Sequence, residues 1–280
     1  SSQPTVWDKD KPLEDFFKKG FLLYTGYTIS MPVLVELSFR LKETPEVLYP
    51  ADVHGLFFNL FEESIAQRLH KEAKKPFGIK GFSVKDSTLR LELALLEDGL
   101  YPAFIHGYYF PKEGLHIRGI PLSPTKEKGL KEKKAFSYRE LLETPPHRRL
   151  QMEFVSPTAF NRFKFDYPFP EPYLVFSNLL SRWNAFSEFP LELTEREVLK
   201  GLMVYEFEGS TQEFIIDHKL KRIGFVGRVG FLVKDQELAK KVSVLALFAN
   251  FAGVGIKTTM GMGVVKASLR GAIQRSDLVG

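Results

Sequence analysis

The sequence predicts an α+β protein in which two ferredoxin-like (RRM-like) domains follow one another. Strand-like segments and amphipathic helical patterns occur in both halves, and the second half repeats the order of elements found in the first. Pro145-Pro146 is the strongest boundary signal in the chain. We therefore expect an N-terminal extension over residues 1–30, an N-terminal domain over residues 31–145 and a C-terminal domain over residues 146–280.

In the first half, alternating apolar and polar residues predict a first strand, and apolar residues at helical spacing predict a single helix that begins at Pro50-Ala51-Asp52. Glu97-Asp98-Gly99 is a turn signal between two further strand-like stretches. The expected elements are strand 32–41, helix 52–70, strands 88–95 and 100–110, strand 114–121, a solvated lysine-rich loop 125–134 and a capped helix 137–142.

The second half repeats this architecture without residue-level similarity to the first. The expected elements are strand 149–155, helix 173–186, strands 203–207, 214–220 and 224–233, helix 236–251 and strand 263–269.

The composition indicates a globular protein with a mild preference for anionic partners. Of its 280 residues, 44% are apolar and 26% charged, and the net charge is +5. The absence of cysteine rules out disulfides and thiolate metal sites and suits the cytoplasm. Six histidines without a close-spaced pair argue against zinc, and no apolar run is long enough to span a membrane. Asp166 and Asp217 lack neighbouring carboxylates, which argues against a two-metal nuclease.

A glycine-rich stretch near the C-terminus is the strongest candidate for ligand binding. It contains four glycines, a lysine and two threonines: Gly253, Gly255, Lys257, Thr258, Thr259, Gly261 and Gly263. Glycines permit positive φ and close backbone approach, and exposed N–H groups beside a lysine suit phosphate. The alternative is that Gly253 ends a helix and the others shape turns. The stretch fits neither a P-loop nor a dinucleotide fingerprint, because Ile256 precedes Lys257 and a helix precedes the loop.

The pattern G-x-G-x-K-T-T-x-G-x-G over residues 253–263 resembles the C-terminal loop of CRISPR repeat-processing endoribonucleases of the repeat-associated RNA-binding (RAMP) superfamily. Segment 154–160, Arg182-Trp183-Asn184 and segment 224–227 occur upstream in the order that these enzymes show. The resemblance covers about residues 31–270. It implies two ferredoxin-like domains, in agreement with the order of elements.

The resemblance also implies catalytic residues. His70, followed by several lysines, matches the position of the family's general acid or base, and it makes Lys75, with Lys74 as its substitute, the electrostatic stabiliser. Phe58 stands where family members often have a tyrosine, which leaves room for His54 to take part. Without the resemblance, a lone histidine at a helix end is more often a cap or a surface residue.

The function that the resemblance implies is cleavage of CRISPR precursor RNA within its repeat. RNA supplies its own 2′-OH nucleophile, so neither a metal nor a cofactor is expected, and the products would be a 2′,3′-cyclic phosphate and a 5′-OH. Arg148 and Arg149 near a strand end would contact the RNA backbone. The alternative is a non-catalytic guide-RNA-binding subunit of a CRISPR effector complex. Effector-complex proteins and a second copy of the chain are the further partners considered.

Overall fold

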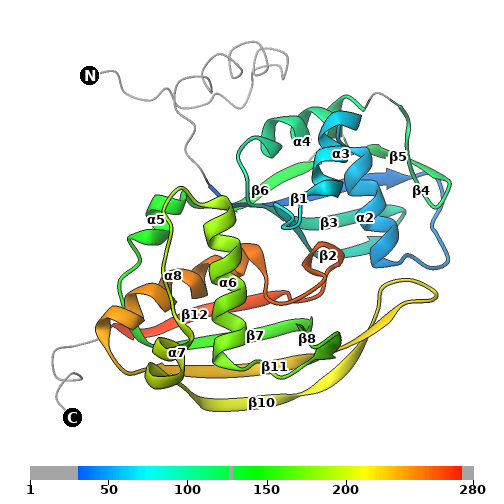
Figure 1. Ribbon diagram of the computed structural model, residues 1–280. Coiled ribbons are helices and arrows are strands. Elements are labelled where there is room, and N and C mark those ends of the chain that lie inside the picture. The colour runs from blue at the N-terminus through cyan, green and yellow to red at the C-terminus, as the bar shows by residue number, and fades with distance from the viewer. Residues whose placement is uncertain (1–30, 112, 126–128, 273–280) are drawn as a thin grey trace, which may run out of the picture.

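The computed structural model describes residues 31–111, 113–125 and 129–272, and the predicted extension over residues 1–30 lies outside this range. The first half contains one six-stranded antiparallel sheet with three helices (Figure 1). Strand β1 lies between β3 on one edge and β5 and β6 on the other. The elements are β1 (Val33–Leu41), α2 (Pro50–Asn59), α3 (Glu63–Lys71), β2 (Phe77–Lys85), β3 (Thr88–Leu95), α4 (Leu100–Tyr109), β4 (Leu115–Ile117), β5 (Ile120–Pro124) and β6 (Leu130–Ala135).

The second half contains a four-stranded antiparallel sheet of order β10-β11-β7-β12 and a small β8-β9 hairpin. Helices α6 and α8 pack beside each other and against this sheet. The elements are α5 (Tyr138–Leu142), β7 (His147–Thr158), β8 (Phe160–Arg162), β9 (Phe165–Tyr167), α6 (Pro172–Phe186), α7 (Glu195–Gly201), β10 (Leu202–Ile215), β11 (Lys221–Val233), α8 (Gln236–Ala252), the 3₁₀ turn η1 (Thr258–Met260) and β12 (Val265–Ala272).

Both halves follow the β-α-β-β-α-β order of a ferredoxin-like domain. In the second half this order is β7, α6, β10, β11, α8 and β12. In the first half it is β1, α2 with α3, β2, β3, α4 and β6, with the β4-β5 hairpin inserted before the last strand. The predicted α+β fold with two tandem ferredoxin-like domains is confirmed.

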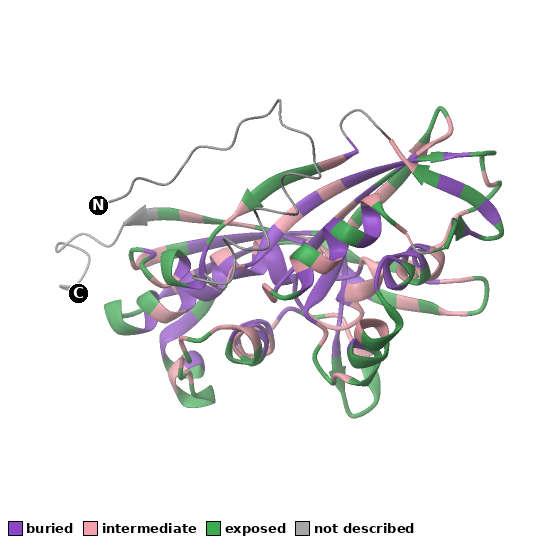
Figure 2. Cartoon of the chain, turned by 90° about the horizontal axis from the view of Figure 1, so that it is seen from above, coloured by how far each residue is buried: buried purple, intermediate pink, exposed green. Residues whose placement is uncertain are grey.

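Each half has its own apolar core, visible as the buried residues between sheet and helices in Figure 2. Helix α5 belongs to the second core, because Tyr138 packs edge-on against Trp183 with ring centroids 5.1 Å apart. The predicted capping box of α5 is present, with the Glu140 N–H donating to Ser137 Oγ at 3.1 Å. The packing therefore groups α5, which precedes Pro145-Pro146, with the second half.

The single helix predicted over residues 52–70 is wrong, since α2 ends at Asn59 and α3 begins at Glu63. Helix α4 crosses at this break. A Cβ on Gly107 of α4 would collide with the Leu60 carbonyl oxygen, so the interrupted chain and α4 fit together only where α4 carries a glycine. The helical spacing of apolar residues does not reveal this break, because Leu60 and Phe61 at the break are buried in the same way as the helix residues on either side.

The strand predicted over residues 100–110 is also wrong, because this segment forms α4. Its aromatic residues favour a strand locally, yet Leu100, Phe104 and Tyr108 recur every four residues and are fully buried on one helix face. The predicted hairpin turn at residues 97–99 is therefore absent, and the hairpin of this region joins β2 to β3. There Asp86 and Ser87 adopt φ values of 49° and 55°.

The lysine-rich segment was predicted to be a solvated loop, but residues 130–135 form strand β6 on the edge of β1. Lys133 Nζ lies 2.6 Å from a carboxylate oxygen of Glu92 and 3.7 Å from one of Glu36, so this lysine pairs with acidic residues of β3 and β1. The strand predicted over residues 203–207 lies within one long β10, whereas the strand predicted over 214–220 is wrong beyond Ile215, because residues 216–220 form the turn to β11. Strands β2, β8 and β9 and helix α7 were not predicted. No helix among the described residues is long and apolar enough to cross a membrane.

Candidate active site

The candidate active site lies where the two halves meet. Helix α2 and strand β2 of the first half contact the segment that joins α8 to β12, here called the glycine loop (residues 253–264). The Ala51 N–H at the start of α2 also donates to the Ile216 carbonyl at 3.1 Å, just after β10. The structure therefore brings α2 and β2 of the first half next to the predicted phosphate-binding loop (Figure 1).

His54 on α2 is bonded directly to the glycine loop, with its Nδ1 lying 3.0 Å from the Thr259 carbonyl oxygen. A carbonyl oxygen only accepts, so Nδ1 carries the proton and the neutral ring keeps a free lone pair on Nε2. Burial lowers the pKa of His54, and the nearby positive charges of His70, Lys257 and Lys75 lower it further, against the opposing effect of the bond to Thr259. The ring is therefore neutral at pH 7 and suited to accept a proton.

His70 lies in the last turn of α3 and is exposed. Its ring stacks on Phe58, with centroids 3.9 Å apart and planes 12° from parallel. Phe58 also contacts His54, with centroids 4.9 Å apart. The break between α2 and α3 turns His70 back towards α2, so that one buried phenyl ring holds both predicted histidines.

Lys75 caps the C-terminus of α3. Its Nζ donates to the carbonyls of Leu69 at 2.6 Å, His70 at 2.8 Å and Glu72 at 2.6 Å. Such a cation satisfies the last carbonyls of the helix and its dipole. Lys75 therefore fixes the backbone that carries His70 while adding positive charge to the site, and Lys74 beside it is exposed.

The glycine loop is held by hydrogen bonds within itself and to neighbouring segments of the second half. Gly253, Gly255, Gly261 and Gly263 all have positive φ, as predicted. The Gly255 N–H donates to Asn178 Oδ1 at 2.9 Å, and the Gly263 N–H donates to the Pro157 carbonyl at 3.1 Å. A Cβ on Gly255 would collide with the Ala159 carbonyl oxygen, and one on Gly263 with the Val254 carbonyl oxygen.

The predicted row of exposed N–H groups is therefore shorter than expected. Gly253, Thr258 and Gly263 are buried, and Gly253 ends α8 by donating to Ala249 at 2.9 Å, so the turn-forming alternative holds for these positions. Within the described residues, the backbone–backbone hydrogen bonds do not use the N–H groups of residues 257–259. Lys257 and Thr259 are partly exposed, which leaves them as the loop's open positions.

Arg148 and Arg149 are not brought to this site. They lie near the start of β7, where Arg149 pairs with Arg270 of β12 and its guanidinium lies 5.7 Å from the centroid of the Tyr205 ring. The glycine loop contacts the other end of β7, at Ser156 and Pro157, about 25 Å away at the rise of a β-strand.

Three side chains around the glycine loop were not assigned a role from the sequence. Asn178 of α6 holds Gly255. Arg182, buried on the same helix, donates to the Ala252 carbonyl that ends α8, and burial lowers its pKa to about 10. Burial, together with the charge of Arg182, lowers the pKa of Lys80 on β2 to about 7. Arg182 belongs to the Arg-Trp-Asn segment noted in the sequence, which was the one available signal.

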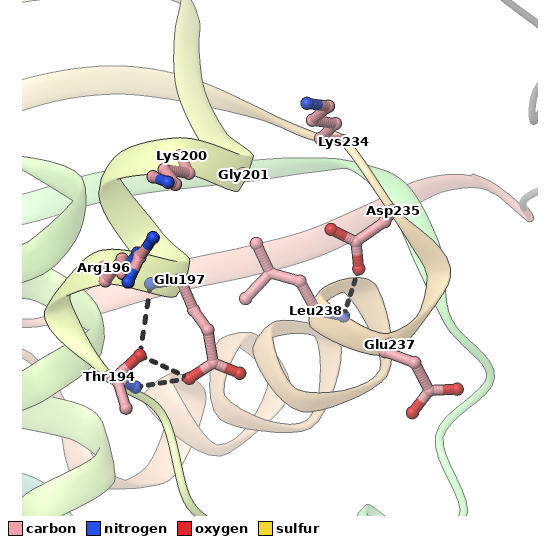
Figure 3. Close-up of a pocket in the computed structure, with 9 residues that line it drawn as sticks. All are labelled: Thr194, Arg196, Glu197, Lys200, Gly201, Lys234, Asp235, Glu237 and Leu238. Atoms are coloured by element: carbon pink, nitrogen blue, oxygen red, sulfur yellow. Dashed lines mark hydrogen bonds between the residues drawn. The ribbon is translucent and has the colours of Figure 1, made fainter.

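A surface pocket between α7 and the start of α8 is distinct from this site (Figure 3). It contains helix caps, since Thr194 and Glu197 form the capping box of α7 and Asp235 caps α8. Helix α8 has 17 residues and meets the glycine loop at its other end, so the pocket lies about 25 Å from the loop. Among the described residues, no group of three or more His, Asp or Glu side chains could hold a metal ion.

Comparisons with known proteins give a consistent family. The family model described as "CRISPR-associated endoribonuclease Cas6" matches residues 152–265. A curated CRISPR-associated endoribonuclease Cas6 of Mycobacterium tuberculosis is 23% identical over 262 residues, covering 91% of this chain and 82% of the relative. One of Streptococcus thermophilus is 22% identical over 223 residues, covering 78% of this chain and 90% of the relative.

The solved structures agree with the curated relatives. A Cas6 product complex is 29% identical to this chain with a TM-score of 0.70, and the match covers 85% of this chain and 99% of the other. The tandem ferredoxin-like fold, the site at the junction and these relatives define the class of the chain, which is an endoribonuclease. Within that class, it is a CRISPR repeat-processing endoribonuclease, and the proteins that it resembles are Cas6 enzymes.

Proposed function

We propose that this enzyme binds the repeat of CRISPR precursor RNA and cuts it once per repeat without a metal ion, leaving a 2′,3′-cyclic phosphate and a 5′-OH. The observation that carries the proposal is the arrangement of two imidazoles on Phe58, one of them bonded to the glycine loop. RNA cleavage by its own 2′-OH needs one group to remove a proton and one to supply a proton.

The geometry supports a role for each histidine. His54 Nε2 takes the 2′-OH proton, the 2′-oxygen attacks phosphorus, and the bond from phosphorus to the 5′-oxygen breaks. Protonated His70 gives its proton to the leaving 5′-oxygen. His54 suits the base because it is neutral and its tautomer is fixed by Thr259. His70 is the proposed acid because its ring is exposed and stacks on the same phenyl ring that contacts His54.

The positive groups of the site stabilise the phosphate as its charge develops. The charges of Lys257 in the glycine loop and of Lys75 at the end of α3 both lower the pKa of His54, which supports a shared role for them at the scissile phosphate. Lys74 and Thr259 are the further candidates for direct RNA contact. Gly253, Gly255, Gly261, Gly263 and Thr258 shape the loop that presents them, and Arg148 and Arg149 would contact only RNA that extends along β7.

The test is an RNA repeat carrying a single 2′-deoxy sugar immediately upstream of the cut, assayed with EDTA beside the all-ribose repeat. The ribose RNA should be cleaved in EDTA to a cyclic phosphate and a 5′-OH, and the deoxy RNA should bind without being cut. Cleavage of the deoxy RNA would disprove attack by the 2′-OH. Binding without cleavage of several repeats would favour the guide-RNA-binding subunit instead.

The partners beyond RNA are also proposals. A non-cleavable repeat bound to the enzyme and analysed by size-exclusion chromatography with light scattering gives the number of protein copies per RNA. A mass of two chains per RNA would support a homodimer. Purified effector-complex proteins added to the same complex test the second class of partner.

A further inference from the structure

The β8-β9 hairpin presents two phenylalanines to solvent. Phe163 is 87% exposed and Phe165 is 76% exposed, the highest values among the large apolar side chains of the described residues. They belong to the tip sequence Arg162-Phe163-Lys164-Phe165, in which aromatic and basic residues alternate. Exposed phenylalanine contributes nothing to a core, so the fold does not explain this pair.

The turn at this tip is unusual for its residue types. Phe163 has φ 50° and Lys164 has φ 69°, and two-residue hairpin turns of this kind favour glycine, asparagine or aspartate. The hairpin therefore has bulky side chains where the backbone favours small ones.

The base of the hairpin is held firmly. Arg222 of β11 donates to both carboxylate oxygens of Asp166 at 3.2 Å. Glu171 accepts from Arg162 at 3.0 Å and from the Tyr167 hydroxyl at 2.6 Å. These bonds neutralise Asp166 and Glu171, while none of the ion pairs of the described residues involves Lys164. The hairpin therefore presents its phenyl rings and an exposed lysine from a rigid support.

The hairpin is continuous with the glycine loop. The Ala159 carbonyl, one residue before β8, accepts the Ile256 N–H of the loop at 2.9 Å. Phe163 follows four residues later, which places its backbone within about 13 Å of that contact at the rise of a strand. An RNA strand held at the loop therefore lies within reach of the hairpin.

We propose that the hairpin tip binds unpaired nucleotides next to the cleavage site, with bases stacking on Phe163 and Phe165 and a phosphate near Lys164. Stacking on aromatic rings is the general way in which proteins hold unpaired RNA bases, and alternation with basic residues suits a nucleic acid better than an apolar protein surface. This inference rests on the proposed function, because the RNA must pass through the glycine loop.

The experiment measures binding of a non-cleavable repeat, with the 2′-deoxy sugar at the cut, and with 2-aminopurine at each unpaired position next to it in turn. In the wild-type enzyme at least one position should be quenched by stacking. Phe163→Ala and Phe165→Ala should each weaken binding about tenfold and relieve that quenching. Leu199→Ala, which removes an exposed apolar side chain on α7, is the matched control and should leave binding unchanged.

Removal of the unpaired flanks from the RNA should abolish the difference between wild type and the phenylalanine variants. Wild-type affinity and unchanged quenching in Phe163→Ala/Phe165→Ala, with a wild-type melting temperature, would overturn the inference. So would loss of self-association or protein binding in this variant with RNA binding intact. Failure of the wild-type enzyme to cleave ribose RNA would instead contradict the proposed function, so the two failures are distinguishable.

Discussion

The two halves of the chain share one order of strands and helices but differ at the ends of those helices. In the second half, α6 runs without interruption over 15 residues, whereas its counterpart in the first half is broken into α2 and α3. Helix α4, the counterpart of α8 in the first half, ends at Tyr109, whereas α8 leads directly into the glycine loop. The break turns His70 towards Phe58, and the loop carries Thr259 to His54. The site is thus formed where each half departs from the shared fold.

The largest expected effect comes from the broken helix. His70→Ala removes the proposed acid and should lower the single-turnover cleavage rate about a hundred- to ten-thousand-fold, with little change in the affinity for non-cleavable RNA. His218→Ala, an exposed histidine in the turn after β10, is the control and should cleave at the wild-type rate. Wild-type cleavage by His70→Ala would exclude His70 as the acid.

The next effect separates two roles of His54. His54→Ala should lower the cleavage rate about a hundredfold. Because burial lowers the pKa of His54, the neutral base persists below pH 6.5, and the acid limb of kcat/KM in the wild-type enzyme should have its midpoint below that value. The limb should vanish in the variant.

His54→Asn is the matched comparison, because an amide N–H can still donate to Thr259 while no base is present. Its rate should resemble that of His54→Ala. A rate near wild type in His54→Asn would make His54 a positioning residue that holds the loop.

The third prediction concerns the loop of the second half. Gly263→Ala forces a side chain into the Val254 carbonyl at φ 69° and should lower the free energy of unfolding by about 2–4 kcal/mol, measured by urea denaturation. Gly261→Ala also has positive φ, but its nearest atom lies 3.6 Å away, so its cost should be only about 1 kcal/mol. Equal costs would mean that backbone conformation alone, and not close approach, fixes the loop.

The smallest expected effect tests the contact between the halves. The Lys80 pKa is about 7 in the folded protein and about 10.5 when unfolded, so between these values only the unfolded chain holds the proton. The free energy of unfolding should therefore rise with pH over this window. Lys80→Met should flatten this rise and stabilise the protein at pH 7 by about 1–3 kcal/mol. A steeper pH dependence in the variant would contradict the burial of this ammonium beside Arg182.

The sequence predicted the second half better than the first. Helix α8, strand β12 and the positive φ of the glycines follow from local signals, because a long apolar period, a glycine stop and a short alternating strand lie in one continuous stretch. The segment over residues 100–110 forms helix α4 because Leu100, Phe104 and Tyr108 pack into the core on one helix face. This tertiary packing could not be predicted from the aromatic content of the segment, which favours a strand. The break after Asn59 depends on Gly107, almost fifty residues away.

The candidate site was predictable in part. The loop residues follow from their glycine and lysine pattern, and His70 and His54 from a resemblance, but the contacts of the two histidines with Phe58 and Thr259 depend on tertiary packing. Lys75 was predicted to stabilise the charge on the phosphate. Its three hydrogen bonds to carbonyls at the end of α3 could not be predicted, because they depend on a turn that no local sequence pattern specifies. Arg148 and Arg149 are close in sequence to segment 154–160, yet an extended strand separates them from the loop.

The hydrogen bond from His54 to Thr259 crosses from one half to the other. As a consequence, the His54 imidazole is fixed in a single tautomer only while the two halves are packed against each other. Fragments divided near Pro145-Pro146 would each lack part of the base, one without the ring and the other without the carbonyl that orients it. Mixing such fragments and following the return of RNA cleavage would therefore report reassembly directly.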